Sequence, residues 1–198
     1  MRTLHGPHTR GPVGPVAPGP TTVSDRRSWR EVKLVALDFA RSGTEAAPRV
    51  TAVALVPVHH GRVFVGGLRR WIVPAGDGIP RDMMDRLDRA YVVTWSPTVD
   101  RELLERACGE GPAGWRRRTL DLRRLAPTVD RTRGDVGEGV SYELPDVARR
   151  CRVPVPQPLE VDDGALTIAQ LFLVLATRLE SAGCRSVGAL LGVGGYDR

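Results

Sequence analysis

Residues 34–43, LVALDFARSG, constrain the fold more than any other segment of the chain. A short, mostly apolar run bounded by turn residues is typical of a strand buried inside a sheet. This run brings one acid, Asp38, to its end. An ionised carboxylate there is costly unless water, a metal or a hydrogen-bond donor meets it, so Asp38 is a candidate site residue. Side chains two apart in a strand share a face, so an acid at position 40 could bind a metal beside Asp38, but the chain has Ala40 there.

Further segments follow this strand in the chain. They are 91–104 (YVVTWSPTVDRELL), 115–125 (WRRRTLDLRRL), 142–153 (YELPDVARRCRV) and 163–175 (DGALTIAQLFLVL). Together with DFARSG at 38–43, they resemble, in the same order, the motifs of the proofreading-type 3'-5' exonucleases. This is the DEDDh family, which includes the epsilon subunit of bacterial DNA polymerase III. The resemblance covers roughly residues 32–192.

The resemblance places two acids of this chain at acidic positions of the family. Asp38 stands at the first acid of the first motif, and Asp100 at the acid of the second. Ala40 stands where the first motif has Glu. In the third motif Gly164 stands where the family has Asp, and Leu159 where it has His. The motifs are therefore degenerate, and the family topology implies that the Asp38 and Asp100 carboxylates approach each other.

The missing residues bear on catalysis. The family hydrolyses phosphodiesters with two divalent metals roughly 4 Å apart, held by four acids, and with a His general base. Mg²⁺ takes few protein ligands and keeps waters, so two acids could hold an ion weakly, but paired metals are not expected. The four histidines all lie at or before position 60. A register shifted by one makes Asp163 the final acid but puts Pro158 at the base position.

Each candidate acid also has a structural interpretation. Asp38 could end a strand and accept a hydrogen bond from a loop, and Asp100 could be a first-turn acid favoured by the helix macrodipole. Asp163 could be the N-cap of the last helix. The functional prediction is that Asp38 and Asp100 are catalytic residues and bind a metal, with Asp163 as a substitute metal ligand. If the chain is active, the cofactor is Mg²⁺ or Mn²⁺; otherwise it needs none.

The chain is basic, with a formal net charge of +6, and Lys33 is its sole lysine. Basic chains suit nucleic-acid backbones, and arginine holds phosphate with a bidentate fork. The predicted nucleic-acid-binding residues form one cluster: Arg116, Arg117, Arg118, Arg123 and Arg124. Two alternatives remain open. The cluster could be a solvated face, and the general excess of arginine could reflect the codon bias of a GC-rich genome.

Composition divides the chain in two. Residues 1–28 are rich in proline and glycine, which predicts a disordered tail, and residues 29–198 have the length of one domain. No apolar run reaches the roughly 18 residues of a membrane span, and no hydrophobic leader precedes the domain, so we expect a cytoplasmic protein with no membrane partner. The three cysteines lack the spacing of a disulfide framework or a zinc site.

Hydrophobic periodicity and turn signals predict the elements of this domain. We expect strands at 32–38, 50–58, 62–73, 91–94 and 120–122, and helices at 81–89, 100–108, 164–182 and 187–191. The first three strands form an antiparallel meander that turns at His59-His60-Gly61. With the family resemblance, this implies an α/β fold: a ribonuclease H-like mixed sheet flanked by helices.

The functional expectation is a degenerate 3'-5' exonuclease-like domain with impaired catalysis. It would bind nucleic acid, with single-stranded DNA favoured, or a protein partner in DNA metabolism. The alternative is an active metal-dependent 3'-5' exonuclease with a rearranged site. A scaffold with no nucleic-acid role would be favoured if the arginine clusters scatter over the surface. The choice between DNA and RNA, the pathway and the oligomeric state stay open.

Overall fold

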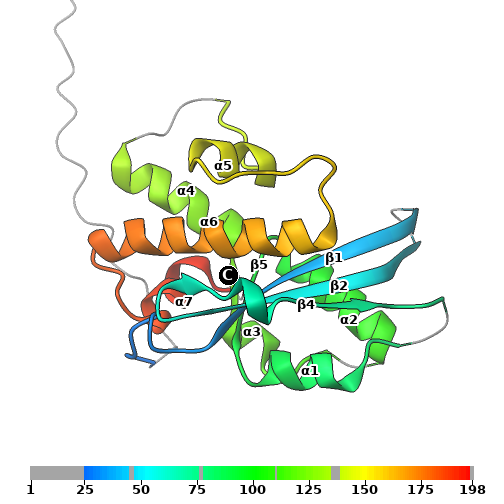
Figure 1. Cartoon of the computed structure of the whole chain (residues 1–198). Helices are drawn as coiled ribbons and strands as arrows, with labels where there is room; N and C mark the ends of the chain where they lie inside the picture. Colours follow the sequence, from blue (N-terminus) through cyan, green and yellow to red (C-terminus); the bar gives the residue numbers. More distant parts are fainter. Residues whose placement is uncertain (1–24, 45–46, 76–77, 110, 135–138, 197–198) are drawn as a thin grey trace, which may run out of the picture.

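The computed structural model describes residues 25–44, 47–75, 78–109, 111–134 and 139–196, and a mixed sheet forms its middle layer (Figure 1). The strands are β1 Leu34–Thr44, β2 Ala47–His59, β3 Arg62–Val63, β4 Arg69–Ile72, β5 Tyr91–Thr94 and β6 Thr119–Asp121. Their order is β3-β2-β1-β5-β6, and β4 also pairs with β2. β2 is antiparallel to β1, β3 and β4, whereas β5 is parallel to both β1 and β6. The predicted mixed sheet with antiparallel first strands is therefore present.

Helices cover both faces of the sheet (Figure 1). They are α1 Arg81–Asp88, α2 Pro97–Cys108, α3 Trp115–Arg118, α4 Leu122–Arg133, α5 Leu144–Arg150, α6 Val161–Ser181 and α7 Val187–Gly194, with a 3-10 turn, η1, at Val65–Gly67. α4, α5, α6 and α7 pack on one face. α1 and α2 pack on the other, with Trp115 of α3.

The side chains of β1 alternate between these two layers. Leu34 and Ala36 belong to the core on the α6 side, and Val35 and Leu37 to the core on the α1 and α2 side. Full burial of a Leu or Val side chain is worth about 1.5–3 kcal/mol, so covering both faces explains the nearly continuous apolar run. Asp38 is two residues after Ala36 on the same strand and therefore also faces α6.

β1 is longer than predicted. It continues beyond Asp38 to Thr44, paired with β2 and with a register irregularity between Ala40 and Arg41. Its parallel pairing with β5 ends earlier, at Ala36. Asp38 therefore lies inside a strand rather than at its end, just past the point where β1 separates from β5. Beyond Ala36, β5 no longer pairs with β1, so the segment that follows β5 can lie beside that part of β1.

Other boundaries also differ from the prediction, and two of them bear on the site or on a turn. The expected strand 62–73 is divided into β3 and β4 by η1, where a Cβ at Gly67 would lie 2.9 Å from Pro57 Cγ, so glycine allows this close turn. α6 begins at Val161, with Glu160 as its N-cap residue. Asp163 therefore lies in the first turn of α6 and is not its N-cap, and the predicted start at 164 is three residues late.

α4 is not among the expected helices, and Pro127 lies inside it. Proline removes one backbone hydrogen bond from a helix and clashes with the preceding turn. The helix forms nevertheless, because Leu122, Leu125, Ala126 and Val129 share one face and are buried in the core. Asp121 caps its start by accepting a hydrogen bond from the backbone N–H of Arg123 at 2.9 Å.

The predicted tail, residues 1–28, falls mostly outside the described residues, but its last four residues pack on the domain. The backbone carbonyl of Asp25 accepts from Gly188 N–H and that of Arg27 from Val187 N–H, each at 3.0 Å. The Tyr91 hydroxyl also donates to the Asp25 carboxylate at 2.6 Å. The folded part of the chain therefore includes residues 25–28.

α6 has 21 residues and is apolar enough, by length and composition alone, to cross a membrane. In this fold it is the central helix of the larger core, where Ile168, Leu171, Phe172 and Leu175 are buried. Packing inside the domain accounts for its apolar character.

Candidate functional site

Asp38 is a half-buried carboxylate on the α6 face of β1. Burial raises its pKa to about 6, and the Phe39 backbone and the charge of Arg41 oppose this rise only in part. The ordinary pKa of an aspartate is about 4. Asp38 takes part in no ion pair with another described residue, so its charge is poorly compensated.

Asp100 lies in the first turn of α2, directly after β5, and is only 9% exposed. Burial raises its pKa to about 7; the Thr94 hydroxyl, which donates to Asp100 Oδ2, lowers it, and the negative charge of Asp38 raises it further. The two carboxylates therefore lie close enough to repel each other. This agrees with the expectation that the start of the second-motif helix reaches Asp38.

Gly164 explains how α6 can lie directly against this pair. A Cβ added at Gly164 would overlap Asp38 Oδ2 and lie only 2.9 Å from Asp38 Cγ. The residue that stands at the family's last acid is thus adjacent to the first acid, in agreement with the register of the resemblance. It provides helix backbone there instead of a carboxylate, and any side chain would require Asp38 or α6 to move.

The remaining third-motif residues add no metal ligand. Leu159, at the position of the family's His, is 42% exposed and has no group that could take a proton. Asp163 is half-buried in the first turn of α6. Among the described residues, no three or more His, Cys, Asp or Glu side chains are grouped so that they could hold a metal. Asp163 therefore does not complete the predicted three-acid set with Asp38 and Asp100.

These donors limit what the site could hold. Two carboxylates, Asp38 and Asp100, could contribute to binding one hard cation that keeps most of its waters, because Mg²⁺ needs few protein ligands. They do not suffice for the paired metals of the exonuclease family. In the described part of the chain, the donor set fits at most one divalent cation.

Sequence reasoning missed Arg41 as a site residue. It is exposed on β1, and its positive charge lowers the pKa of both Asp38 and Asp100.

Asp121 was also missed. It ends β6 beside Thr94, and burial raises its pKa. A short apolar strand ending in an acid is the same signal that identified Asp38, but Asp121 serves as the N-cap of α4.

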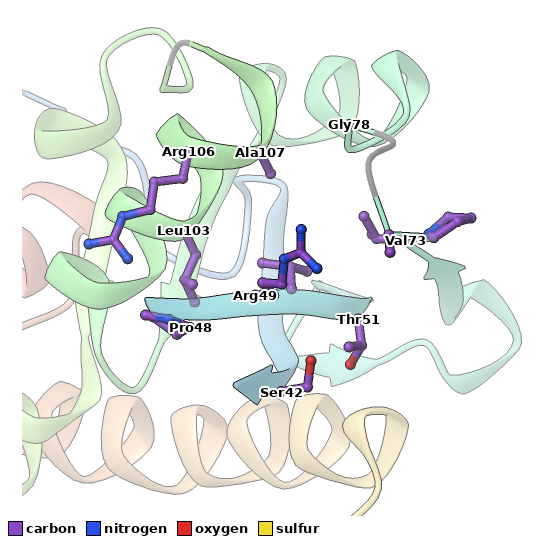
Figure 2. Close-up of a pocket in the computed structure, with 12 residues that line it drawn as sticks. Ser42, Pro48, Arg49, Thr51, Val73, Gly78, Leu103, Arg106 and Ala107 are labelled. Carbon is purple, nitrogen blue, oxygen red and sulfur yellow. The ribbon is translucent and has the colours of Figure 1, made fainter. Parts of the chain in front are cut away.

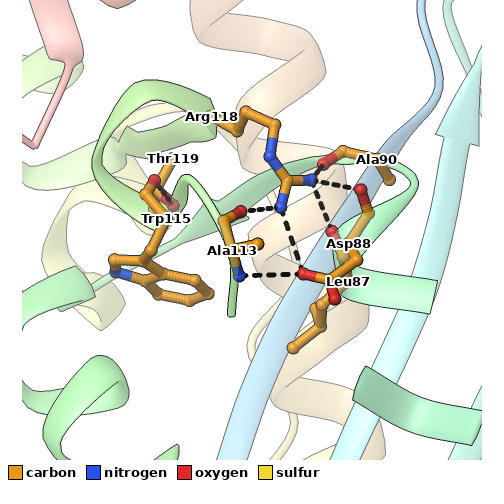
Figure 3. Close-up of polar contacts among 7 residues, drawn as sticks. All are labelled: Leu87, Asp88, Ala90, Ala113, Trp115, Arg118 and Thr119. Atoms are coloured by element: carbon orange, nitrogen blue, oxygen red, sulfur yellow. Dashed lines mark hydrogen bonds and ion pairs between the residues drawn. The ribbon is translucent and has the colours of Figure 1, made fainter. Parts of the chain in front are cut away.

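Arg118, one of the predicted nucleic-acid-binding residues, is occupied inside the protein (Figure 3). Its guanidinium donates to the backbone carbonyls of Leu87, Asp88, Ala90 and Ala113, and it pairs with the Asp88 carboxylate at 3.3 Å. These bonds join the connection between α1 and β5 to the connection between α2 and α3. Arg118 therefore has a structural role that leaves little of its guanidinium for phosphate.

The other four predicted arginines lie before and after β6. Arg116 and Arg117 are exposed on α3, which precedes β6, and Arg123 and Arg124 belong to α4, which follows it. The Arg116 guanidinium lies over the Tyr196 ring, and Arg124 donates to the carbonyl of the adjacent Gly195 at 2.8 Å. Arg123 pairs with Glu143 at 3.7 Å. Arg116 and Arg124 are therefore held against the C-terminal segment, and Arg123 against Glu143.

A cavity of about 390 Å³ lies between β2, α2 and the segment that follows β4 (Figure 2). Its lining includes two arginines, two hydroxyl side chains and apolar side chains, among them Arg49, Arg106, Ser42, Thr51, Val73 and Leu103. Figure 2 shows that the Arg49 side chain rises from β2 toward α2. The cavity is on the α1 and α2 face of the sheet, whereas Asp38 faces α6.

Comparison with known proteins gives relatives in structure only. No protein-family model and no curated protein matches the sequence. Exonuclease I of E. coli in complex with a dT13 oligonucleotide superposes with a TM-score of 0.59 at 13% identity, over 76% of this chain and 42% of that one. Cell-death related nuclease 4 (CRN-4) gives 0.56 at 13% identity, over 73% of this chain and 63% of that one. An exonuclease I–SSB-Ct complex gives 0.55 at 12% identity, over 77% and 42%.

The chain thus spans less than two thirds of the length of each of these nucleases. At identities this low, the likeness is one of fold and not of activity. The predicted fold class is confirmed: the chain has the mixed α/β, ribonuclease H-like fold of these exonucleases.

Proposed function

We propose that this chain is an exonuclease-like domain that binds single-stranded nucleic acid and cleaves it very slowly or not at all. The contact between Gly164 and Asp38 carries the proposal. It removes the space in which a further carboxylate could join Asp38 and Asp100. Without that ligand, and without a histidine beside the pair in the described part of the chain, neither the paired metals nor the general base of the family is provided there.

Binding is supported by charge near the carboxylate pair. Arg41 is close enough to Asp38 and Asp100 to lower the pKa of both, and Arg49 and Arg106 line the neighbouring cavity. Arginine suits phosphate because its planar fork donates two parallel hydrogen bonds. Exonuclease I, which shares the fold, has been solved with the oligonucleotides dT13 and dA16. The competing proposal is that the same fold binds a protein partner instead of nucleic acid.

A second candidate function is an active metal-dependent 3'-5' exonuclease with a rearranged site. The observation that favours it is the incompletely compensated burial of two carboxylates, Asp38 and Asp100, whose mutual repulsion a divalent cation would relieve. A single cation could polarise a phosphodiester and orient water, although it would not stabilise both the attacking and leaving oxygens.

The test is a nuclease assay with a 5'-labelled single-stranded oligonucleotide in Mg²⁺ or Mn²⁺, with E. coli exonuclease I as a positive control. We expect the wild-type protein to bind the oligonucleotide, with affinity that falls as salt rises. We expect cleavage to be at least 10²–10⁴-fold slower than for the control, which is the typical contribution of general acid-base catalysis alone.

Asp38→Asn separates the two candidates. Robust wild-type cleavage that disappears in Asp38→Asn would refute the impaired domain and establish the active exonuclease. Cleavage that persists in Asp38→Asn would identify a contaminating nuclease. If the oligonucleotide does not bind at low ionic strength, binding of a protein partner is the function that remains.

A further inference from the structure

Among the described residues, the charged side chains that line the cavity between β2 and α2 are those of Arg49 and Arg106. Arg49 forms no hydrogen bond or ion pair with another described residue. Arg106 pairs with Glu102 at 3.7 Å, but both side chains are more than half exposed, at 54% and 56%. Exposed pairs of this kind contribute little, so Arg106 can turn to an anion at small cost.

The rest of the wall is suited to a flat apolar group. Val50, Val73 and Leu103 are buried or half-buried residues of the lining, and Ser42 and Thr51 add hydroxyls that can donate or accept. Ligand sites commonly combine apolar walls with a few polar groups that fix orientation. An anion joined to a flat ring system matches this lining, and a nucleotide has both parts.

The cavity is connected to the carboxylate pair through two elements. Ser42 follows Asp38 by four residues on β1, which is roughly 13 Å along a strand. Leu103 follows Asp100 by three residues on α2, one turn further along the helix. The two elements that carry the carboxylates, β1 and α2, therefore also contribute residues to the cavity.

We infer that this cavity binds one nucleotide of the single strand, with its phosphate on Arg49 and Arg106 and its base over Val73 and Leu103. The inference rests on the proposed nucleic-acid binding and names a contact site for it. It also distinguishes this surface from the sequence-predicted arginines, because none of those five arginines lines the cavity.

The experiment measures the affinity of a fluorescent oligo(dT) at several salt concentrations. The variants are Arg49→Ala, Arg106→Ala and their combination, with Arg117→Ala as the control, because Arg117 is equally an exposed arginine. For the double variant we expect the affinity to fall about tenfold or more. The slope of log K against log salt should fall by about 0.7, since Arg49 and Arg106 hold the same phosphate and each phosphate neutralised on a single strand contributes about 0.7. Arg117→Ala should bind as the wild type does.

The outcomes separate this inference from the proposed function. If the wild type binds and the double variant binds equally well, the inference is overturned and the proposed function stands. Loss of binding in Arg117→Ala alone would assign binding to the sequence-predicted arginines and would also overturn it. All three side chains are exposed, so each variant should have the same thermal midpoint as the wild type. A lower midpoint would reveal a folding defect.

A titration with dTMP, followed by NMR, tests the cavity without a strand. Shifts at the Val73 and Leu103 methyl groups, lost in the double variant, would support the inference even if oligo(dT) binding fails. A parallel titration with inorganic phosphate distinguishes binding of the phosphate group from binding of the base. Equal binding of phosphate and dTMP would refute a base seated over the apolar wall, and no binding of either dTMP or oligo(dT) would refute the site.

Discussion

Gly164 of α6 lies so close to Asp38 of β1 that a Cβ at position 164 would occupy the space of the Asp38 carboxylate. The resemblance to the exonuclease family places an acid at this position, and the structure places helix backbone there. The absence of that acid is therefore coupled to the packing of α6 on the sheet. Restoring the family's residues one at a time would disturb this packing before it could rebuild a site.

Gly164→Ala should destabilise the protein, although alanine is the better helix former by about 1 kcal/mol. The added methyl overlaps the Asp38 carboxylate, and overpacking of a core typically costs about 1–3 kcal/mol. In an Asp38→Ala background the carboxylate is gone, so the same change should be neutral or stabilising. Urea unfolding of the four proteins of this double-mutant cycle measures the coupling. Additive effects would contradict the contact.

The triple variant Ala40→Glu, Leu159→His, Gly164→Asp should consequently fail to recover nuclease activity. Asp at 164 adds a charge as well as bulk beside Asp38, and a buried like charge is costly unless a cation meets it. We expect loss of folded protein, seen as a lower thermal midpoint, before any gain in cleavage. A stable triple variant that cleaves DNA would show that α6 can move outward and that the site decayed by substitution alone.

The stability of the domain should fall as pH rises from about 4 to about 7. In the folded state the pKa of Asp38 is raised to about 6 and that of Asp100 to about 7, so the folded protein binds more protons than the unfolded chain in this interval. Linkage then makes the free energy of unfolding decrease with pH. Urea midpoints at several pH values measure this decrease. Asp100→Asn, which keeps an acceptor for Thr94, should flatten it, and an unchanged slope would contradict the burial of an uncompensated charge.

Asp38 and Asp100 could be identified from sequence because their signals are local. The apolar run of β1 reflects burial on both faces, and Asp100 lies in the first turn of the helix that follows β5. The site's other features depend on tertiary distance. Nothing near Gly164 in the chain reveals that Asp38 touches it, and nothing local distinguishes Arg118, which bonds to four carbonyls, from its exposed neighbour Arg117.

A divalent cation should stabilise the domain weakly, and more at pH 8 than at pH 5.5. The ligands of Mg²⁺ are ionised carboxylates, and the raised pKa of Asp38 and Asp100 means that protons compete with the metal at lower pH. Binding to the folded state alone raises the thermal midpoint with metal concentration. The rise should vanish in Asp38→Asn. A rise of equal size at both pH values, or one that survives Asp38→Asn, would locate the cation elsewhere.

Arg118→Met should destabilise the protein by about 2–3 kcal/mol, whereas Arg117→Met should change its stability by less than about 0.5 kcal/mol. The Arg118 guanidinium satisfies four backbone carbonyls and the Asp88 carboxylate between two connections (Figure 3). Methionine retains the apolar stem but supplies no donor, so these oxygens lose their partners. Lysine keeps the charge but not the planar fork, and Arg118→Lys should recover only part of the loss. Thermal and urea unfolding of the three variants measure these differences. If Arg118→Met is as stable as Arg117→Met, the structural role fails, and oligo(dT) affinity of the Arg118 variants would then decide whether this side chain contacts nucleic acid.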